Sequence, residues 1–568
     1  MAAILTLHNP ARAAEYYGAG YWRKDTLYSL LQHHAAVRPN KFALRDSHRR
    51  LTWGQLLEWV DCVAFELHQA GLKAGQRVSV WLPNRAETIV VTLACSRNGY
   101  ICNPSLHQSY TVADVVNLLT RIQSVVLFAQ QDFGADAGRR NIFETAYQVA
   151  TIKRVYCLRP VASAGLPHLG AGAASTAAGL PAAVVDPDKI VLLAFTSGTT
   201  GEPKGVMHSD NTLLANARAM AADWRHHEAI VLLSMSPLTH AIGTIAMAQA
   251  LVSGFELVLN DVPLGKTTLD WVHETGATYI MGVPTHAIDV LAETKRRGHD
   301  RLGKVSVFYM GGSAIPRETV RALLDLGITP QNVYGMTENG AHQYTLPDDD
   351  TQTIVETCGR ACAGYEVRTW SQEDPDVEVA RGGIGEIGGR GACLMLGYFD
   401  NQNATEQSFN RYGWFMTGDL GRLDEKGRLQ IVGREKDIII RGGRNIHPAR
   451  IEDLARSHPC VTKAAAFPVA DERLGEKVCL AVVPQDAARI DPQMLLDHLH
   501  ERGLSKYDMP EYFVAVDAFP MTPSGKILKR ELVEWARSGR IKPRSVRWPG
   551  SRKTLSATTS AEVQRDRH

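Results

Sequence analysis

The sequence has no long apolar run, no closely paired cysteines and no excess charge of one sign. No stretch approaches the roughly 18 consecutive apolar residues that a membrane-spanning helix needs. The opening residues, MAAILTLHNPARAAEYYG, have no basic segment ahead of an apolar run, so we expect no signal peptide there. Lys and Arg total 62 against 60 Asp and Glu, and the formal charge of +2 favours neither nucleic acid nor an acidic membrane as a partner.

The cysteines are spread singly along the chain. The closest two, Cys358 and Cys362, have no second pair with which to complete a zinc site. An odd number of scattered cysteines is typical of reduced, mostly buried thiols in a cytosolic protein. We therefore expect a soluble cytoplasmic enzyme, monomeric or homodimeric, without a membrane span.

The chain has 568 residues, too many for one hydrophobic core, so we expect at least two domains. An amphipathic pattern over residues 86–99 predicts a helix. Strands alternating with helices predict an α/β fold in which mixed, largely parallel sheets are flanked by helices. Apolar, β-branched runs predict these strands at residues 77–83, 124–129, 229–235, 255–259 and 305–310.

The domain organisation follows from changes in composition. After Gly433 a charged segment, REKD, leads into a compact unit with predicted strands at 463–469 and 477–484. The Ala- and Gly-rich stretch 161–186 is typical of a surface loop or linker. We expect three parts: a large N-terminal domain (1–435), a small mobile α+β domain (436–541) and a flexible basic tail (542–568).

The strongest chemical motif is FTSGTTGEPKGV, residues 195–206. It follows a predicted strand, and its glycines, among them Gly198, let the backbone turn sharply and approach a ligand closely. A hydroxyl- and glycine-rich loop after a strand is suited to binding a polyphosphate. The alternative, a flexible glycine turn, does not account for so many donors in one short segment. These donors are Thr196, Ser197, Thr199, Thr200 and Lys204. The spacing differs from the Walker A pattern.

Further motifs follow along the chain. They are YGMTE at 334–338, GEI at 385–387, GACLMLGY at 391–398, WFMTGD at 414–419, GREKD at 433–437, RGGRNI at 441–446 and TPSGKILK at 522–529. Each has an ordinary structural interpretation when taken alone. YGMTE could begin a helix with a threonine cap, Asp419 could be a turn residue, and lysines on loops are common.

The ordered series resembles the adenylate-forming superfamily of acyl-CoA synthetases, firefly luciferases and peptide-synthetase adenylation domains, from about residue 22 to 534. The resemblance implies an ATP-dependent, AMP-forming acid–CoA ligase. Such an enzyme converts a carboxylic acid to an acyl-adenylate, releases pyrophosphate, and transfers the acyl group to coenzyme A with release of AMP. It implies ATP, Mg²⁺ and coenzyme A as cofactors and a small-molecule acid as substrate.

In the nucleotide site that the resemblance implies, Tyr334 stacks on adenine and Thr337 contacts the α-phosphate. Glu338 and Thr196 hold Mg²⁺, with hard oxygen ligands as this cation prefers. Asp419 and Arg434 bind the ribose hydroxyls. The other nucleotide-binding positions are Ser197, Gly198, Thr199, Thr200, Lys204, Gly312, Gly335 and Met336. Segments 385–387 and 391–398 match a structural motif, to which we assign no catalytic role.

For the two half-reactions the resemblance implies a moving small domain. Lys526 is the catalytic lysine, contacting the substrate carboxylate and the α-phosphate during adenylation. Lys436 is the pivot of the hinge. Gly442 and Gly443 let the pantetheine arm of coenzyme A pass close to the backbone. We predict that rotation about Lys436 withdraws Lys526 and brings the Gly442 region to the active site.

The acyl pocket is expected to begin at 236–244, SPLTHAIGT. His240 is predicted at the junction of the carboxylate and the thiol channel, although a lone histidine is equally a packed core residue. Ala241 stands where amino-acid-activating members carry an aspartate. An apolar wall would suit an aliphatic medium-chain or alicyclic acid. The wall residues are Ala241, Ile242, Gly243, Thr244, Met310, Gly311, Gly312 and Met336.

Three alternatives stay open at this point. A related enzyme could load the acyl group onto a carrier protein, a non-catalytic homologue could only bind nucleotide or acyl ligand, and a luciferase-like oxygenase could oxidise the adenylate. The presence of Lys526, Glu338, Asp419 and Lys204 argues against the second.

Overall fold

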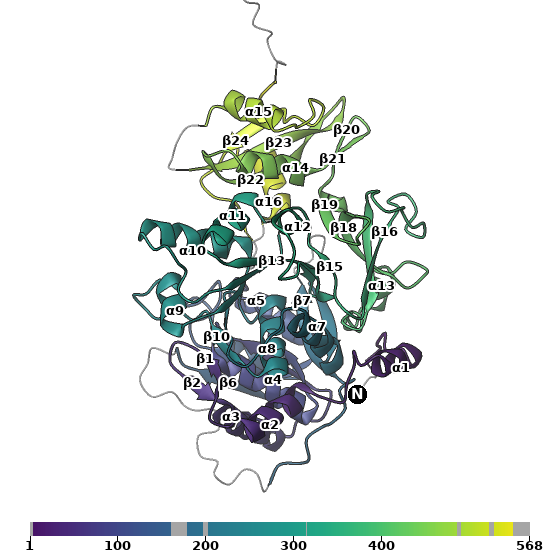
Figure 1. Cartoon of the computed structure of the whole chain (residues 1–568). Coiled ribbons are helices and arrows are strands. Elements are labelled where there is room, and N and C mark those ends of the chain that lie inside the picture. The colour runs from purple at the N-terminus through teal and green to yellow at the C-terminus, as the bar shows by residue number, and fades with distance from the viewer. Residues whose placement is uncertain are drawn as a thin grey trace, which may run out of the picture. The chain divides into compact units, whose positions relative to one another are not determined.

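The computed structural model describes residues 4–160, 179–196, 203–313, 315–485, 490–521 and 527–548 (Figure 1). The chain divides into two compact units. One comprises Met1–Lys436 with Met521–Ile527, and the other Asp437–Pro520 with Leu528–His568. No helix among the described residues is both long and apolar enough to cross a bilayer.

The first unit contains two large sheets whose inner strands are parallel. The first has nine strands in the order β15-β14-β13-β12-β11-β9-β10-β1-β2, and the second has six in the order β6-β5-β3-β4-β7-β8. The nine-stranded sheet consists of β1 (Phe42–Arg45), β2 (Arg50–Thr52), β9 (Val231–Ser234), β10 (Glu256–Leu259), β11 (Tyr279–Gly282), β12 (Val307–Gly311), β13 (Thr329–Met336), β14 (Gly340–Tyr344) and β15 (Arg360–Ala361). The six-stranded sheet consists of β3 (Arg77–Trp81), β4 (Ile101–Asn103), β5 (Ser124–Gln130), β6 (Arg154–Leu158), β7 (Ile190–Thr196) and β8 (Lys204–Ser209).

Helices flank these sheets, as the predicted fold class requires. They are α1 (Pro10–Gly18), α2 (Leu27–Val37), α3 (Trp53–Gln69), α4 (Ala86–Asn98), α5 (Val112–Arg121), α6 (Ile142–Thr145), η1 (Ala146–Gln148), α7 (Asp210–Asp223), α8 (Ala241–Ser253), α9 (Thr268–Thr275), α10 (Pro284–Arg296), α11 (Arg317–Asp325), α12 (Thr351–Glu356) and α13 (Gln402–Glu406). The mixed α/β fold with largely parallel sheets is confirmed.

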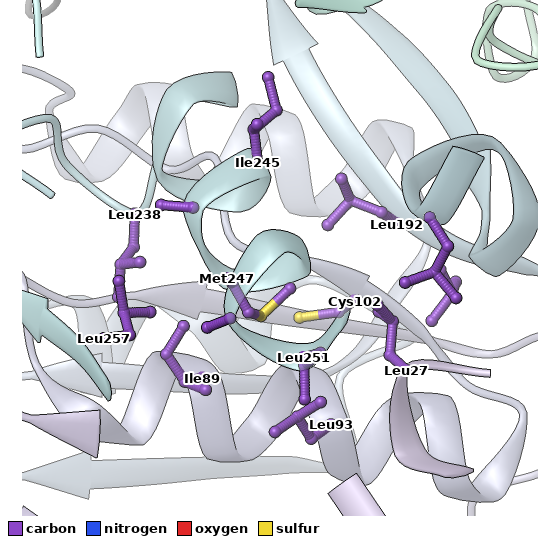
Figure 2. Packing of buried hydrophobic residues seen from close by; sticks show 14 of the residues in the cluster. Leu27, Ile89, Leu93, Cys102, Leu192, Leu238, Ile245, Met247, Leu251 and Leu257 are labelled. Carbon is purple, nitrogen blue, oxygen red and sulfur yellow. The ribbon is translucent and has the colours of Figure 1, made fainter. Parts of the chain in front are cut away.

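The main core of this unit surrounds α8. In Figure 2, Ile245, Met247 and Leu251 of α8 lie among apolar side chains that include Ile89 and Leu93 of α4. Strands of both sheets contribute to the same cluster, so α8 is buried between them. This burial fixes the position of its first turn.

Two smaller parts complete the fold. An antiparallel sheet follows in the first unit, with strands β16 (Tyr365–Trp370), β17 (Gly385–Gly391), β18 (Phe415–Leu423) and β19 (Leu429–Arg434). The second unit is a smaller α+β unit. It comprises β20 (Ile439–Arg441), β21 (Arg444–Ile446), α14 (Pro448–Arg456), β22 (Val461–Asp471), β23 (Gly475–Pro484), α15 (Pro492–Glu501), β24 (Tyr512–Ala515), α16 (Lys529–Arg537) and β25 (Arg544–Ser545). The short helix η3 (Glu435–Asp437) spans the boundary between the two units.

Every strand predicted from the sequence is present, but two other expectations need correction. Helix α4 is not amphipathic, because all of its residues are buried among α2, α3, α8 and the six-stranded sheet. The tail is ordered at its start, since Arg544–Ser545 pairs with β24 and the indole of Trp548 donates a hydrogen bond to Asp497 at 3.0 Å. Residues 549–568 lie outside the described residues, as does most of the stretch 161–186.

Candidate nucleotide and acyl site

The polyphosphate motif forms the end of a β-hairpin. Strand β7 ends at Thr196 and β8 begins at Lys204, and these two residues are paired across the antiparallel ladder. The short connection between them therefore starts and ends at one edge of the six-stranded sheet. The predicted phosphate ligands Ser197, Gly198, Thr199 and Thr200 lie outside the described residues.

Tyr398 joins two of the predicted site residues. The Lys204 ammonium lies 4.7 Å from the centre of the Tyr398 ring, and the Tyr398 hydroxyl donates a hydrogen bond to Glu338 Oε1 at 3.0 Å. Main-chain pairing of Val206 with Tyr398 holds the tyrosine beside β8. Burial, and then the charge of Glu338, raise the pKa of the Tyr398 hydroxyl, so it remains a donor at neutral pH. The sequence analysis missed this role, because nothing local in GACLMLGY distinguishes a packing tyrosine from one that touches a site.

A second cluster unites Tyr334, Asp419 and Arg434. The Tyr334 hydroxyl donates to Asp419 Oδ2 at 2.9 Å, and Arg434 Nε donates to Asp419 Oδ1 at 3.0 Å. The three residues come from β13, β18 and β19. Burial, followed by the nearby Asp419 charge, raises the pKa of Tyr334 well above its ordinary value. The three predicted adenosine-binding residues are thus in direct contact.

The irregular part of β18 that carries Asp419 is held from β17. Gly418 has a positive φ of 72°, and its amide donates to the Glu386 carboxylate at 2.8 Å. The Asp419 amide donates to Thr417 Oγ1 at 3.1 Å. Burial raises the pKa of Glu386 above its ordinary value. The GEI segment, for which no catalytic role is predicted, therefore orients the part of β18 that carries a predicted ribose ligand.

The YGMTE motif spans the end of β13 and the turn into β14. A side chain at Gly335 would overlap the carbonyl oxygen of Gly340, so the close approach of the two strands requires glycine there. Met336 packs against the cluster that contains Tyr398, and its amide donates to Asn339 Oδ1 at 3.0 Å. Gly312 follows the end of β12 and has a φ of 88°.

The predicted acyl-pocket segment forms the start of α8. His240 is the N-cap, and its ring Nδ1 accepts a hydrogen bond from the Ile242 amide at 3.4 Å. A side chain at Gly243 would lie 2.6 Å from the carbonyl oxygen of Pro237, so only glycine fits that turn. Met310 was expected in the same wall as Ile242, which packs in the main core cluster. Met310 is fully buried in a different apolar cluster, because alternate residues of β12 point to opposite faces of the sheet.

In the second unit, Gly442 and Gly443 form the turn between β20 and β21. Their φ angles are 57° and 83°, which is the left-handed pair that a two-residue hairpin turn requires. The turn alone therefore accounts for both glycines. Lys436 lies in η3, the last residue of the first unit, and Lys526 lies outside the described residues.

A cavity of about 670 Å³ lies at the carboxyl ends of β3, β5 and β6. Trp81, Phe133 and Cys157 are among the residues that line it. None of the predicted site residues that the structure describes lines it, so this cavity is separate from the two side-chain clusters described above.

Comparison with known proteins supports the family resemblance that the sequence motifs indicate. Residues 31–399 match the AMP-binding enzyme family, and residues 450–526 match the AMP-binding enzyme C-terminal domain. The chain is 31% identical over 535 residues to the medium-chain fatty-acid–CoA ligase of Escherichia coli, covering 93% of both chains. It is 32% identical over 523 residues to the sulfoacetate–CoA ligase of Cupriavidus necator, covering 90% of this chain and 98% of that one.

A solved structure agrees with the fold. ATP-bound MatB from Rhodopseudomonas palustris superposes with a TM-score of 0.79 at 28% identity, covering 90% of this chain and 99% of that chain. With both parts of the family signature present in order, the chain belongs to the AMP-binding enzyme family and is an ATP-dependent, AMP-forming acid–CoA ligase.

Proposed function

We propose that this ligase activates an aliphatic medium-chain or alicyclic carboxylic acid. The observation that carries the proposal is the apolar start of α8, where Ala241, Ile242 and Gly243 follow His240 without a charged side chain. The E. coli relative named for medium-chain fatty acids supports the same class of acid. A sulfonate-bearing acid, suggested by the other relative, would need a cation to compensate its second charge, and residues 241–244 supply none.

For ATP, we assign the adenosine end to the cluster of Tyr334, Asp419 and Arg434. A carboxylate with two acceptor oxygens is suited to two ribose hydroxyls, and each oxygen of Asp419 is already oriented by one protein donor. The phosphates are assigned to the hairpin of Thr196 and Lys204 and to Thr337. The Lys204 ammonium would neutralise charge on the departing pyrophosphate.

The donor set fits Mg²⁺ that enters together with ATP. Among the described residues there is no group of three or more His, Cys, Asp or Glu side chains that could hold a metal alone. Mg²⁺ commonly needs only one or two carboxylates when substrate phosphates supply the remaining ligands. Glu338 would provide the carboxylate and Thr196 a hydroxyl. The cation would supply charge neutralisation of the phosphates.

In the adenylation step the substrate carboxylate already bears its negative charge, so attack on phosphorus needs no general base. The protein contributes positioning and charge neutralisation. We assign Lys526 to the carboxylate and α-phosphate, and His240 to the junction of the acid and the thiol channel.

For thioester formation, we propose that residues 436–541 move about Lys436 relative to residues 1–435 and that the Gly442–Gly443 turn lines the path of the pantetheine arm. All nine cysteines are free thiols, which supports a reducing, cytoplasmic compartment.

The function is tested by measuring pyrophosphate release with ATP and Mg²⁺, with and without coenzyme A. The acids should include octanoate, decanoate, cyclohexanecarboxylate, benzoate, sulfoacetate and amino acids. Fast turnover that depends on coenzyme A with octanoate or cyclohexanecarboxylate is the expected result. Preference for sulfoacetate would contradict the proposed acid. An adenylate that coenzyme A fails to discharge would instead identify a carrier protein as the acceptor.

A further inference from the structure

His208 connects the two nucleotide motifs of the first unit. It lies near the end of β8, the strand that begins at Lys204 of the polyphosphate motif. Only 3% of its surface is exposed. Its Nε2 lies 2.7 Å from the carbonyl oxygen of Thr337, which is 129 positions later in the chain. A single side chain from one motif therefore holds the backbone of the other.

The partners of the ring determine its tautomer. A carbonyl oxygen can only accept, so Nε2 carries the hydrogen that Thr337 receives. Nδ1 is then an acceptor, and the Thr212 hydroxyl, which also donates to the Ser209 carbonyl, lies 3.0 Å from it. Burial lowers the pKa of His208 to about 4, so the ring is neutral at neutral pH. Thr212 also belongs to the capping box of α7, which anchors the histidine to that helix.

The hydrogen bond from His208 to the Thr337 carbonyl fixes the peptide group that precedes Glu338 in the chain. The Thr337–Glu338 peptide is planar and trans, so its carbonyl and the Glu338 amide point in opposite directions. On the other side of Glu338, its own carbonyl oxygen accepts from the Met395 amide at 2.7 Å. Both peptide groups that flank Glu338 are thus anchored, which fixes the stretch of backbone from which its carboxylate projects.

We propose that His208 is a positioning residue for adenylate formation, orienting the Thr337–Glu338 peptide for the α-phosphate and Mg²⁺ through its Nε2–H. This inference rests on the proposed roles of Thr337 and Glu338. Nothing in the sequence motif indicates it, because His208 lies outside the glycine- and hydroxyl-rich segment.

The test compares His208→Leu, which removes the donor, with His208→Gln, whose side-chain amide can donate in the place of Nε2. His34 supplies a matched control, since its Nε2 donates to the Leu251 carbonyl at 2.7 Å and the side chain is also buried. The measurements are carboxylate-dependent ATP–pyrophosphate exchange, giving kcat and KM for ATP, the Mg²⁺ concentration for half-maximal rate, and the unfolding midpoint.

We expect His208→Leu to lower kcat of exchange by roughly 10²-fold, as misplacement of a reacting group by about 1 Å does. Its half-maximal Mg²⁺ concentration should rise, and His208→Gln should recover most of the rate. His34→Leu should lower the unfolding midpoint similarly and leave kcat unchanged. Unchanged exchange in His208→Leu would overturn the inference, as would a folded His208→Gln that recovers nothing. Absence of exchange in the wild-type protein with every acid would instead refute the proposed function.

Discussion

The Tyr334 hydroxyl donates a hydrogen bond to Asp419 Oδ2 at 2.9 Å, across 85 positions of sequence. The same carboxylate accepts from Arg434 on its other oxygen. A buried carboxylate with one neutral and one cationic donor is held in one orientation before any nucleotide arrives. Preorganisation of this kind reduces the conformational entropy lost when a ligand binds.

Removing the Tyr334 hydroxyl should weaken ATP binding without abolishing chemistry. In Tyr334→Phe the ring that we assign to adenine remains, but Asp419 loses one anchoring donor. We expect KM for ATP to rise by roughly tenfold, equivalent to about 1.4 kcal/mol, while kcat changes little. The measurement is ATP–pyrophosphate exchange at saturating acid. Tyr28→Phe is the matched control, because the Tyr28 hydroxyl donates to Asp61 at 2.6 Å and lies outside the site. Equal KM values for both variants would contradict the assignment.

Asp419→Asn tests whether this carboxylate binds the ribose. If it does, the wild-type enzyme discriminates between ATP and 2′-deoxy-ATP, because the deoxy analogue leaves an acceptor without its hydroxyl. A hydrogen bond to a charged group contributes about 1.5–3 kcal/mol, so the ratio of the two kcat/KM values should be at least tenfold. The ratio should approach one in Asp419→Asn. A variant that keeps the full wild-type preference would place the ribose elsewhere.

Tyr398→Phe should affect the metal requirement more than acid binding. The substitution removes the hydrogen bond to Glu338 but keeps the ring beneath Lys204. Glu338 then has one orienting donor fewer, and we expect the Mg²⁺ concentration for half-maximal rate to rise by roughly tenfold or more. Titration of Mg²⁺ at fixed ATP measures it. Tyr398→Leu, which removes the ring as well, should also lower kcat, so identical behaviour of the two variants would refute a role for the ring.

Substitutions of Lys436 and Lys526 should separate the two half-reactions. Lys526→Ala should lower adenylate formation by roughly 10²–10³-fold, as loss of one charge-stabilising contact does, yet still convert a supplied acyl-adenylate to the thioester. Lys436→Pro should do the reverse, because proline restricts the backbone rotation that the second step needs. Single-turnover assays starting from acid or from synthetic adenylate distinguish these outcomes. If Lys436→Pro left both half-reactions intact, rotation about this residue would be refuted.

Buried histidines should make the protein less stable in mild acid. Burial lowers the pKa of His107, His208 and His226 to about 4 and that of His342 to about 3. The unfolded chain, with histidine pKa values near 6.5, binds protons that the folded chain does not. Stability is therefore fully present above about pH 6.5 and falls as the pH drops toward 4, by about 1.4 kcal/mol per pH unit for each histidine.

Urea unfolding midpoints measured between pH 7 and 5 test whether stability falls with pH and how steeply it falls. His226→Leu should reduce the slope by the contribution of one proton, since both ring nitrogens of His226 are buried without a hydrogen-bond partner among the described residues. The exposed His33, replaced by Gln, should leave the slope unchanged. A slope that is the same in His226→Leu as in the wild type would contradict the prediction.

Part of the fold and of the site could be predicted from local patterns. The predicted strand at residues 77–83 is β3, and the strand before the phosphate motif is β7, because β-branched apolar runs of that length favour buried strands. The environment of α4 was mistaken, since the sequence pattern does not reveal that partners cover every face of this helix. The sequence also does not show that Met310 and Ile242 pack in different clusters, because the direction of a strand side chain reverses with each residue.

The sequence by itself determined the reaction class, the order of the motifs and the glycines that tight turns require, because these depend on local backbone geometry and on residue chemistry. Only the tertiary structure decided which motifs touch. The contact of Tyr334 with Asp419, the bridge of Tyr398 between Lys204 and Glu338, and the contact of His208 with Thr337 all join segments at least 60 positions apart. Such contacts depend on how the sheets and helices of the first unit pack together, and no local pattern in the chain records that packing.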